Sequence, residues 1–180
     1  HRGISTSFPD RVVPMLPDNL SGHLCSLHEG EKRACIVVKI KIDSVGNKIS
    51  HKFTRAVIQS WASLEYGEVQ EVIDKGKGKP KVLDLVNTVI KPLYDAYYCL
   101  KISRKVRSPL DLNLPERKIE IDEKGIVKDV RFKERLEAHK LIEEFMILAN
   151  VCAAETLSYK KTPTIFRVHE EPDKEKIEAL

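Results

Sequence analysis

One stretch in the carboxyl-terminal half constrains the fold more than any other. Residues 134–157 read ERLEAHKLIEEFMILANVCAAETL and contain neither glycine nor proline. The stretch is rich in Leu, Ala, Met, Glu and Lys, which favour helix. Apolar side chains recur at helical spacing and form a broad face: Leu136, Leu141, Ile142, Phe145, Leu148, Ala149 and Cys152. The pattern predicts one long helix at the centre of the core.

The polar side chains of this predicted helix fall into two stripes. One stripe lies in the first half, and we expect it to face solvent: Glu137, Lys140 and Glu144. The other lies on a different side and extends into the apolar second half: His139, Glu143 and Asn150. Because Glu143 places a carboxylate where the helix becomes buried, it is a candidate site residue. Its neighbour Glu144 points about 100° away, so the two carboxylates cannot chelate one ion as a simple pair.

Two stretches predict β-hairpins. Residues 34–42 and 49–59 are rich in β-branched residues and flank a turn that contains glycine. We expect Trp61, which follows, to anchor this hairpin to the core. Residues 117–122 and 126–132 alternate polar and apolar side chains around a second glycine turn. Both patterns predict antiparallel pairs.

Helical patterns lie between the hairpins. A short helix is predicted at 64–73, with three apolar residues directed inward: Val69, Val72 and Ile73. The loop 75–81 carries four lysines, which suit a solvated linker or phosphate contacts. A helix follows at 82–106, and Pro92 is expected to kink it. The basic end of this helix suits either the helix dipole or a phosphate-facing patch.

The remaining segments are predicted to be extended or short. The prolines of residues 8–17 exclude a helix there, and residues 21–27 are expected to continue this extended segment and to tuck apolar side chains against the core. A connector bounded by proline is predicted at 108–115. A short strand is expected at 164–169, followed by the beginning of a closing helix.

The totals place the chain among globular proteins. Of its 180 residues, 42% are hydrophobic and 32% charged, as in one domain or part of a larger one. No apolar run approaches the ~18 residues of a membrane helix, and no signal peptide is visible, so we expect a cytoplasmic protein without membrane contact. Because the chain opens at His1, we expect an internal segment of a longer protein. The net charge of +4 permits an anionic partner such as nucleic acid.

Local sequence patterns for common catalytic sites are missing. The four cysteines are far apart and form no C-x-x-C pair, so we expect buried thiols: Cys25, Cys35, Cys99 and Cys152. The aspartates form no close-set cluster of the kind that two-metal hydrolysis requires. No H-x-x-x-H, G-x-S-x-G, P-loop or dinucleotide fingerprint is present. The residue patterns predict an α+β (mixed α/β) fold with β-hairpins packed against long helices, and assign no reaction.

Several stretches together resemble the catalytic domain of the ribonuclease II (RNB) family. They occur in the order found in that family and cover nearly the whole chain: RG at 2–3, FPDRVVPMLP at 8–17, LCSL at 24–27, LEY at 64–66 with Val69, LDL at 110–112, LPE at 114–116, AHKLIEEFMILANV at 138–151 and FRVHE at 166–170. The two longest runs are specific, and a chance match to both is very improbable.

The resemblance implies a magnesium-dependent 3′-to-5′ exoribonuclease that hydrolyses single-stranded RNA to nucleoside 5′-monophosphates. Tyr66 matches the family tyrosine that contacts the terminal nucleotide at the active site. Glu143 matches a family glutamate close to the last nucleotide and its sugar, where a carboxylate can accept a hydrogen bond from a ribose 2′-hydroxyl. Leu112 stands near the position of a base-stacking aromatic in the family and offers RNA an apolar contact only. Without the resemblance, Tyr66 also fits an aromatic on a helix surface that packs on the hairpin, and Glu143 a partner of Lys140 on the surface of its helix.

The chain also departs from the family pattern. The cluster of metal-binding aspartates lies upstream of Arg2 in the family, and the catalytic arginine lies downstream of the last helix. The flanking cold-shock-like and S1-like domains are likewise outside these residues. We therefore expect residues 1–180 to be the middle of a catalytic domain that binds no Mg²⁺ and is inactive alone. The alternative is a catalytically dead RNA-binding or interaction module from a split or decayed gene, and a third reading is a structural domain with incidental positive charge.

Overall fold

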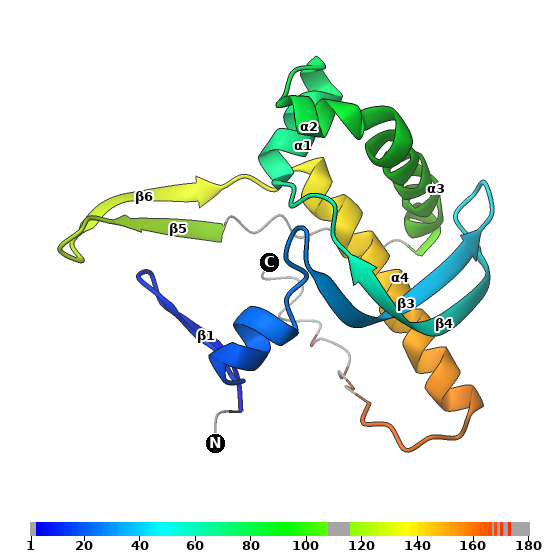
Figure 1. Cartoon of the computed structure of the whole chain (residues 1–180). Helices are drawn as coiled ribbons and strands as arrows, with labels where there is room; N and C mark the ends of the chain where they lie inside the picture. Colours follow the sequence, from blue (N-terminus) through cyan, green and yellow to red (C-terminus); the bar gives the residue numbers. More distant parts are fainter. Residues whose placement is uncertain (1–2, 108–115, 167, 169, 171–172, 174–180) are drawn as a thin grey trace.

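The structure is a computed structural model that describes residues 3–107, 116–166, 168, 170 and 173. Its elements in chain order are β1 (Thr6–Ser7), β2 (Val12–Val13), the π-helix η1 (Asn19–Leu24), β3 (Lys32–Ile42), β4 (Lys48–Gln59), α1 (Tyr66–Lys75), α2 (Pro80–Asp84), the π-helix η2 (Val86–Ile90), α3 (Lys91–Arg107), β5 (Glu116–Ile121), β6 (Val127–Lys133) and α4 (Glu137–Tyr159). In this part of the chain, the strands form three separate two-stranded antiparallel sheets: β1 with β2, β3 with β4, and β5 with β6. The expected α+β class is confirmed (Figure 1).

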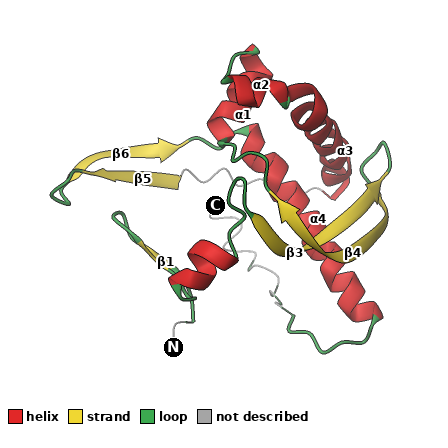
Figure 2. Ribbon diagram, in the orientation of Figure 1, coloured by secondary structure: helices red, strands yellow, loops and turns green. Residues whose placement is uncertain are grey.

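Helix α4 is the spine of the fold, as its periodicity predicts. It begins at Glu137 because Leu136 has extended dihedral angles, φ −71° and ψ 159°. Helices α1 and α3 pack against it, and Figure 2 shows α1, α2 and α3 around the upper part of α4. The central core cluster comes from these helices and the segment between them: Val72, Val82, Ile90, Tyr94, Tyr97 and Leu141. Burying each such side chain contributes about 1.5–3 kcal/mol to folding.

The predicted helix over 82–106 is interrupted, as Pro92 indicates. Helix α2 ends at Asp84, the π-helix η2 follows, and α3 starts at Lys91. Within this region the Ile90 amide donates to the Leu85 carbonyl at 3.0 Å, a wide-turn hydrogen bond. Proline has no amide hydrogen, and its ring clashes with the carbonyl four residues earlier. The wide turn before Pro92 is where the helical hydrogen-bond pattern accommodates the missing amide and the ring of proline.

The first hairpin is confirmed and crosses α4 (Figure 1). Its anchor is not Trp61, which is 79% exposed, so that expectation is wrong. The chain leaves the hairpin at Ser60, which bridges to Glu29, and Trp61 follows this departure. The anchor is instead polar, since His51 Nε2 lies 2.7 Å from the Thr156 hydroxyl of α4.

The turn of this hairpin contacts α3. Its Asp43 carboxylate accepts hydrogen bonds from the backbone amides of Val45 and Asn47, at 3.0 and 2.8 Å. Gly46 has φ +82°, and a Cβ there would lie 2.1 Å from the Cys99 carbonyl oxygen. A left-handed backbone with no space for a side chain requires glycine. The turn therefore fits closely against the α3 backbone.

The second hairpin is also confirmed, and it projects away from the helices (Figure 1). The N-terminal segment forms no helix over 8–17, as expected, but only β2 within it is a strand, and the chain bends at 9–10 and 15–16. Residues 21–27 do not continue it as an extended segment. The carbonyl of Pro17 accepts the amides of Leu20 and Ser21, and η1 forms there. Leu24 and Leu27 are 60% and 55% exposed, so they do not tuck against the core among the described residues.

Other expectations have mixed outcomes. Cys152 is buried, but Cys25 is exposed and Cys35 and Cys99 are partly exposed, so the expectation of four buried thiols holds only for Cys152. The described residues of the predicted strand at 164–169 are not in a strand. The predicted connector at 108–115 and most of the closing helix lie outside the described residues. Within the described part of the chain, no helix is long and apolar enough to cross a membrane.

Candidate functional site

Two aromatic rings from distant parts of the sequence stack where α1 meets α4. Tyr66 is the first residue of α1, and His139 lies in the first turn of α4. Their ring centroids are 4.1 Å apart and the ring planes differ by 19°. His139 Nδ1 accepts the Leu136 backbone amide at 3.2 Å, which places the proton of the neutral ring on Nε2. The imidazole thus caps α4 and supports the tyrosine ring at once.

Gln70 connects the same two helices. Its side-chain carbonyl accepts the Ala138 amide at 3.0 Å, one of the first amides of α4 that have no partner within the helix. The same oxygen accepts the Tyr94 hydroxyl at 3.5 Å, while the Gln70 amide nitrogen donates to Asp74 at 3.0 Å. The position of α1 on α4, and with it the position of Tyr66, is held by these polar contacts as well as by packing.

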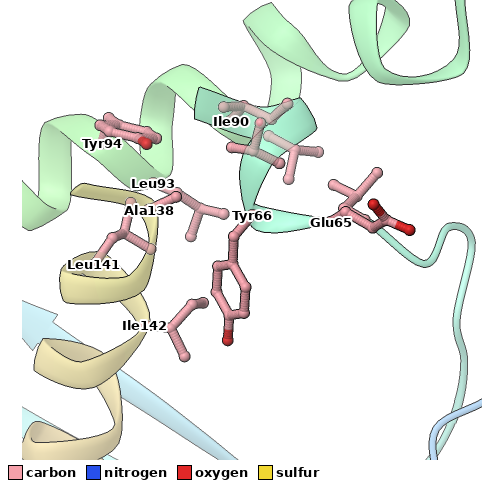
Figure 3. A pocket seen from close by; sticks show the side chains of 11 residues that line it. Glu65, Tyr66, Ile90, Leu93, Tyr94, Ala138, Leu141 and Ile142 are labelled. Carbon is pink, nitrogen blue, oxygen red and sulfur yellow. The ribbon is translucent and has the colours of Figure 1, made fainter. Parts of the chain in front are cut away.

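An apolar cavity of about 130 Å³ opens beside Tyr66. Its walls come from the start of α1, from η2 and α3, and from α4: Leu64, Glu65, Tyr66, Val69, Val89, Ile90, Leu93, Tyr94, Ala138, Leu141 and Ile142. Figure 3 shows the Tyr66 ring beside Ile142, with its hydroxyl directed away from Ile90 and Tyr94. Tyr66 is 44% exposed, so its ring is both a cavity wall and accessible from outside.

The two adjacent glutamates of α4 have opposite environments. The Glu143 side chain is 44% exposed and pairs with Arg135 at 2.5 Å. Glu144 is only 3% exposed, and its carboxylate accepts a hydrogen bond from Arg104 of α3 at 2.7 Å. The expectation that Glu144 faces solvent is therefore wrong, because α3 packs on that side of α4. The alternative pairing of Glu143 with Lys140 is also wrong, since Lys140 pairs with Glu137.

Sequence reasoning missed a polar cluster around Glu137. The Tyr97 hydroxyl, Lys101 and Lys140 all donate to its carboxylate, at 2.8, 2.9 and 3.0 Å. Burial raises the pKa of Glu137, but these hydrogen bonds outweigh burial and hold that pKa at about 2, below its ordinary 4.5. Burial, and then the bond to Glu137, raise the pKa of Tyr97. The signal was the helical spacing of Tyr97 with Lys101 and of Glu137 with Lys140.

The lysine-rich loop and the basic end of α3 are largely engaged with carboxylates. In the loop and its flanks, three lysines form ion pairs with acidic residues: Lys75 with Glu71, Lys79 with Glu68, and Lys81 with Glu29. Lys101 and Arg104 of α3 pair with Glu137 and Glu144 of α4. Lys101 and Arg104 connect α3 to α4, whereas Lys75 and Glu71 both lie in α1. The side chains of Lys75 and Lys79 are mostly exposed, in agreement with a solvated linker.

The structure brings two of the three predicted site residues to one region. Tyr66 contacts His139, and Glu143 lies one turn further along the same face of α4. Tyr66 packs on His139, and not on the first hairpin as the surface alternative supposed. Asn150 is exposed further along α4. Leu112 lies outside the described residues. No group of three His, Cys, Asp or Glu side chains among the described residues could hold a metal ion.

Residues 1–180 match the RNB domain family. Ribonuclease R of Escherichia coli (strain K12) is 34% identical over 180 residues, which cover 100% of this chain and 22% of that protein. Ribonuclease R of Aquifex aeolicus (strain VF5) is 36% identical over 182 residues, covering 99% of this chain and 25% of that protein. The chain thus spans about a quarter of the length of these relatives.

A solved structure has the same fold. The apo form of Mycoplasma genitalium RNase R aligns with a TM-score of 0.87 and 29% identity, over 98% of this chain and 27% of that chain. The same enzyme in complex with ribose-methylated single-stranded RNA also aligns with a TM-score of 0.87. The resemblance seen in the sequence is confirmed by both the family match and the fold. Since the match runs from residue 1 to residue 180, this chain belongs to the RNB domain family.

Proposed function

We propose that residues 1–180 form the middle of the catalytic domain of a 3′-to-5′ exoribonuclease that hydrolyses single-stranded RNA to nucleoside 5′-monophosphates. The observation that carries this proposal is the RNB match over the whole chain. The fold shared with an RNase R bound to single-stranded RNA supports RNA as the partner.

Tyr66 is proposed to contact the terminal nucleotide. Its half-exposed ring stands beside an apolar cavity, and an aromatic face that is accessible from one side is a stacking surface for a base. Such stacking tolerates any base, which suits an enzyme that removes nucleotides one after another.

Glu143 is proposed to distinguish RNA from DNA. Its carboxylate is accessible, and a ribose 2′-hydroxyl is a hydrogen-bond donor that deoxyribose lacks. Arg135 pairs with this carboxylate at 2.5 Å. Buried Glu144 is not available for this role. Leu112 is proposed as an apolar RNA contact from the family resemblance alone.

The family implies Mg²⁺, and the described residues do not fit a magnesium site. Mg²⁺ prefers several oxygen ligands in octahedral geometry, and no group of three candidate ligands exists among the described residues. The metal ligands of the proposed enzyme must therefore be other residues. We expect the 180 residues alone to bind RNA without hydrolysing it.

The proposal is tested with the 180-residue chain and with the intact enzyme that contains it. Labelled single-stranded oligo(A) is incubated with each in the presence of magnesium, and the products are separated. We expect 5′-mononucleotides from the intact enzyme and none from the chain alone. Mononucleotide release by the chain would contradict its expected inactivity. An intact protein that binds oligo(A) without cleaving it would support the alternative, a catalytically dead RNA-binding module.

A further inference from the structure

We infer that His139 is a positioning residue for Tyr66, holding its ring in the orientation that stacks on the terminal base of RNA. The inference rests on the proposed function and extends its site by one residue. The observation behind it is the close, nearly parallel contact of the two rings, at 4.1 Å and 19°.

Tyr66 has little support of its own. It is the first residue of α1, its predecessor Glu65 is extended, and its successor is Gly67, around which a Cβ would meet no atom within 4 Å. A side chain at the first position of a helix, next to glycine, is weakly restrained by its own backbone. Its ring is also 44% exposed, so packing alone does not enclose it. The face-to-face contact that its ring makes is the stack on His139.

His139, in contrast, is firmly held. Its Nδ1 accepts the Leu136 amide at 3.2 Å, which closes the first turn of α4. A hydrogen bond of 3.0 Å from the Ala138 amide to the Gln70 side chain fixes this first turn to α1. The imidazole ring is therefore a rigid platform built on the central helix, and the tyrosine rests on it. Offset or parallel stacking restricts ring orientation without burying the ring.

Two variants separate this role from simple capping of the helix. His139→Gln keeps a side-chain acceptor for the Leu136 amide, as Gln does in capping boxes, and removes the ring. His139→Phe keeps a ring for the stack and removes the acceptor. A residue that only caps α4 tolerates Gln and not Phe, whereas a residue that positions Tyr66 tolerates Phe and not Gln.

The experiment uses the 180-residue chain and oligo(A) with 2-aminopurine at its 3′ end, whose fluorescence is quenched when the base stacks. A fluorescein label at the 5′ end reports total affinity by anisotropy. We expect the wild-type chain and His139→Phe to quench the terminal base to a similar extent. His139→Gln should lose more than half of the quenching, and Tyr66→Ala nearly all of it. Total affinity should change less than about threefold in each variant, because phosphate contacts dominate binding.

The outcomes distinguish this inference from the proposed function. A wild-type chain that shows no anisotropy change even at low salt overturns RNA binding, and the inference with it. Binding with full quenching in His139→Gln overturns the inference alone. Quenching that is kept in His139→Gln and lost in His139→Phe, together with a loss of thermal stability in His139→Phe alone, would assign His139 to the cap and overturn the inference. Binding of the wild-type chain without quenching would remove Tyr66 from the terminal nucleotide and so overturn the inference.

A second measurement does not depend on RNA. Proton NMR of the free chain reports the ring current of His139 on the Tyr66 ring protons. We expect these resonances to shift toward ordinary tyrosine positions in His139→Gln and to remain displaced in His139→Phe. Unchanged Tyr66 resonances in His139→Gln would show that the stack does not hold the ring, and would overturn the inference whatever the RNA result.

Discussion

Glu144 of α4 and Arg104 of α3 form a hydrogen-bonded ion pair at 2.7 Å, with the glutamate side chain only 3% exposed. The pair ties together the two longest helices of the described chain. Its neighbour Glu143 is 44% exposed and pairs with Arg135 on the surface of α4. Two identical side chains in succession thus divide between holding the fold and offering a carboxylate to solvent.

Replacing Glu144 should destabilise the protein strongly. In Glu144→Ala the Arg104 guanidinium remains partly buried without this carboxylate, and breaking such a pair costs about 3 kcal/mol or more. Urea unfolding followed by circular dichroism measures the change. Glu143→Ala is the matched control, for which we expect a loss below about 1 kcal/mol because exposed pairs contribute little. Similar losses in the two variants would contradict the assigned environments.

Gly46→Ala should be more harmful than the same change at another glycine with positive φ. A Cβ at Gly46 would lie 2.1 Å from the Cys99 carbonyl oxygen, whereas one at Gly76, φ +66°, would meet nothing within 4 Å. We expect about 1 kcal/mol of destabilisation in Gly76→Ala from the backbone conformation alone, and at least twice that in Gly46→Ala. Thermal unfolding of both variants tests this. An equal effect would show that the turn does not pack on α3 as described.

The Glu137 cluster should make stability depend on pH below neutrality. The pKa of Glu137 is depressed in the folded state to about 2, from an ordinary 4.5. The carboxylate therefore stabilises the fold fully above its unfolded pKa, and this contribution disappears as the pH falls from 4.5 toward about 2. The difference in unfolding free energy between wild type and Glu137→Gln should be largest above pH 5 and shrink as the pH is lowered. A difference that is constant with pH would contradict the cluster.

Glu143→Ala in the intact enzyme should narrow the preference for RNA over DNA. Removing the carboxylate removes the proposed acceptor for the 2′-hydroxyl, a loss of about 1 kcal/mol, or roughly fivefold in the affinity ratio. Competition binding with matched oligo(A) and oligo(dA) gives the ratio. Glu71→Ala is a suitable control, since this exposed glutamate of α1 also forms an ion pair, with Lys75 at 3.7 Å. An unchanged RNA-to-DNA ratio in Glu143→Ala would leave Glu143 a structural role only.

Much of the fold was predictable from local patterns. The long α4, both hairpins, the helix at α1 and the break near Pro92 follow from periodicity, turn residues and the chemistry of proline. These features depend on a few neighbouring residues, so a single sequence contains the information. The family resemblance likewise rests on ordered motifs, and these motifs select Tyr66 and Glu143 as proposed site residues.

What depends on distant contacts was predicted poorly. Trp61 was expected inside and is exposed, while Glu144 was expected outside and is buried. Helical spacing tells which residues share a face, but it does not tell which face another helix covers. The His139–Tyr66 stack joins residues from two helices that are far apart in the chain, and no local pattern indicates it.

The sequence by itself determined the long helices, the two longer hairpins and the family, because each depends on local residue order, and it proposed the candidate site residues. Only the tertiary structure decided which glutamate is accessible, which residue supports Tyr66 and how the first hairpin is anchored. The physical reason is that burial and ring contacts arise where α1, α3 and α4 meet, and that meeting is set by the packing of whole helices.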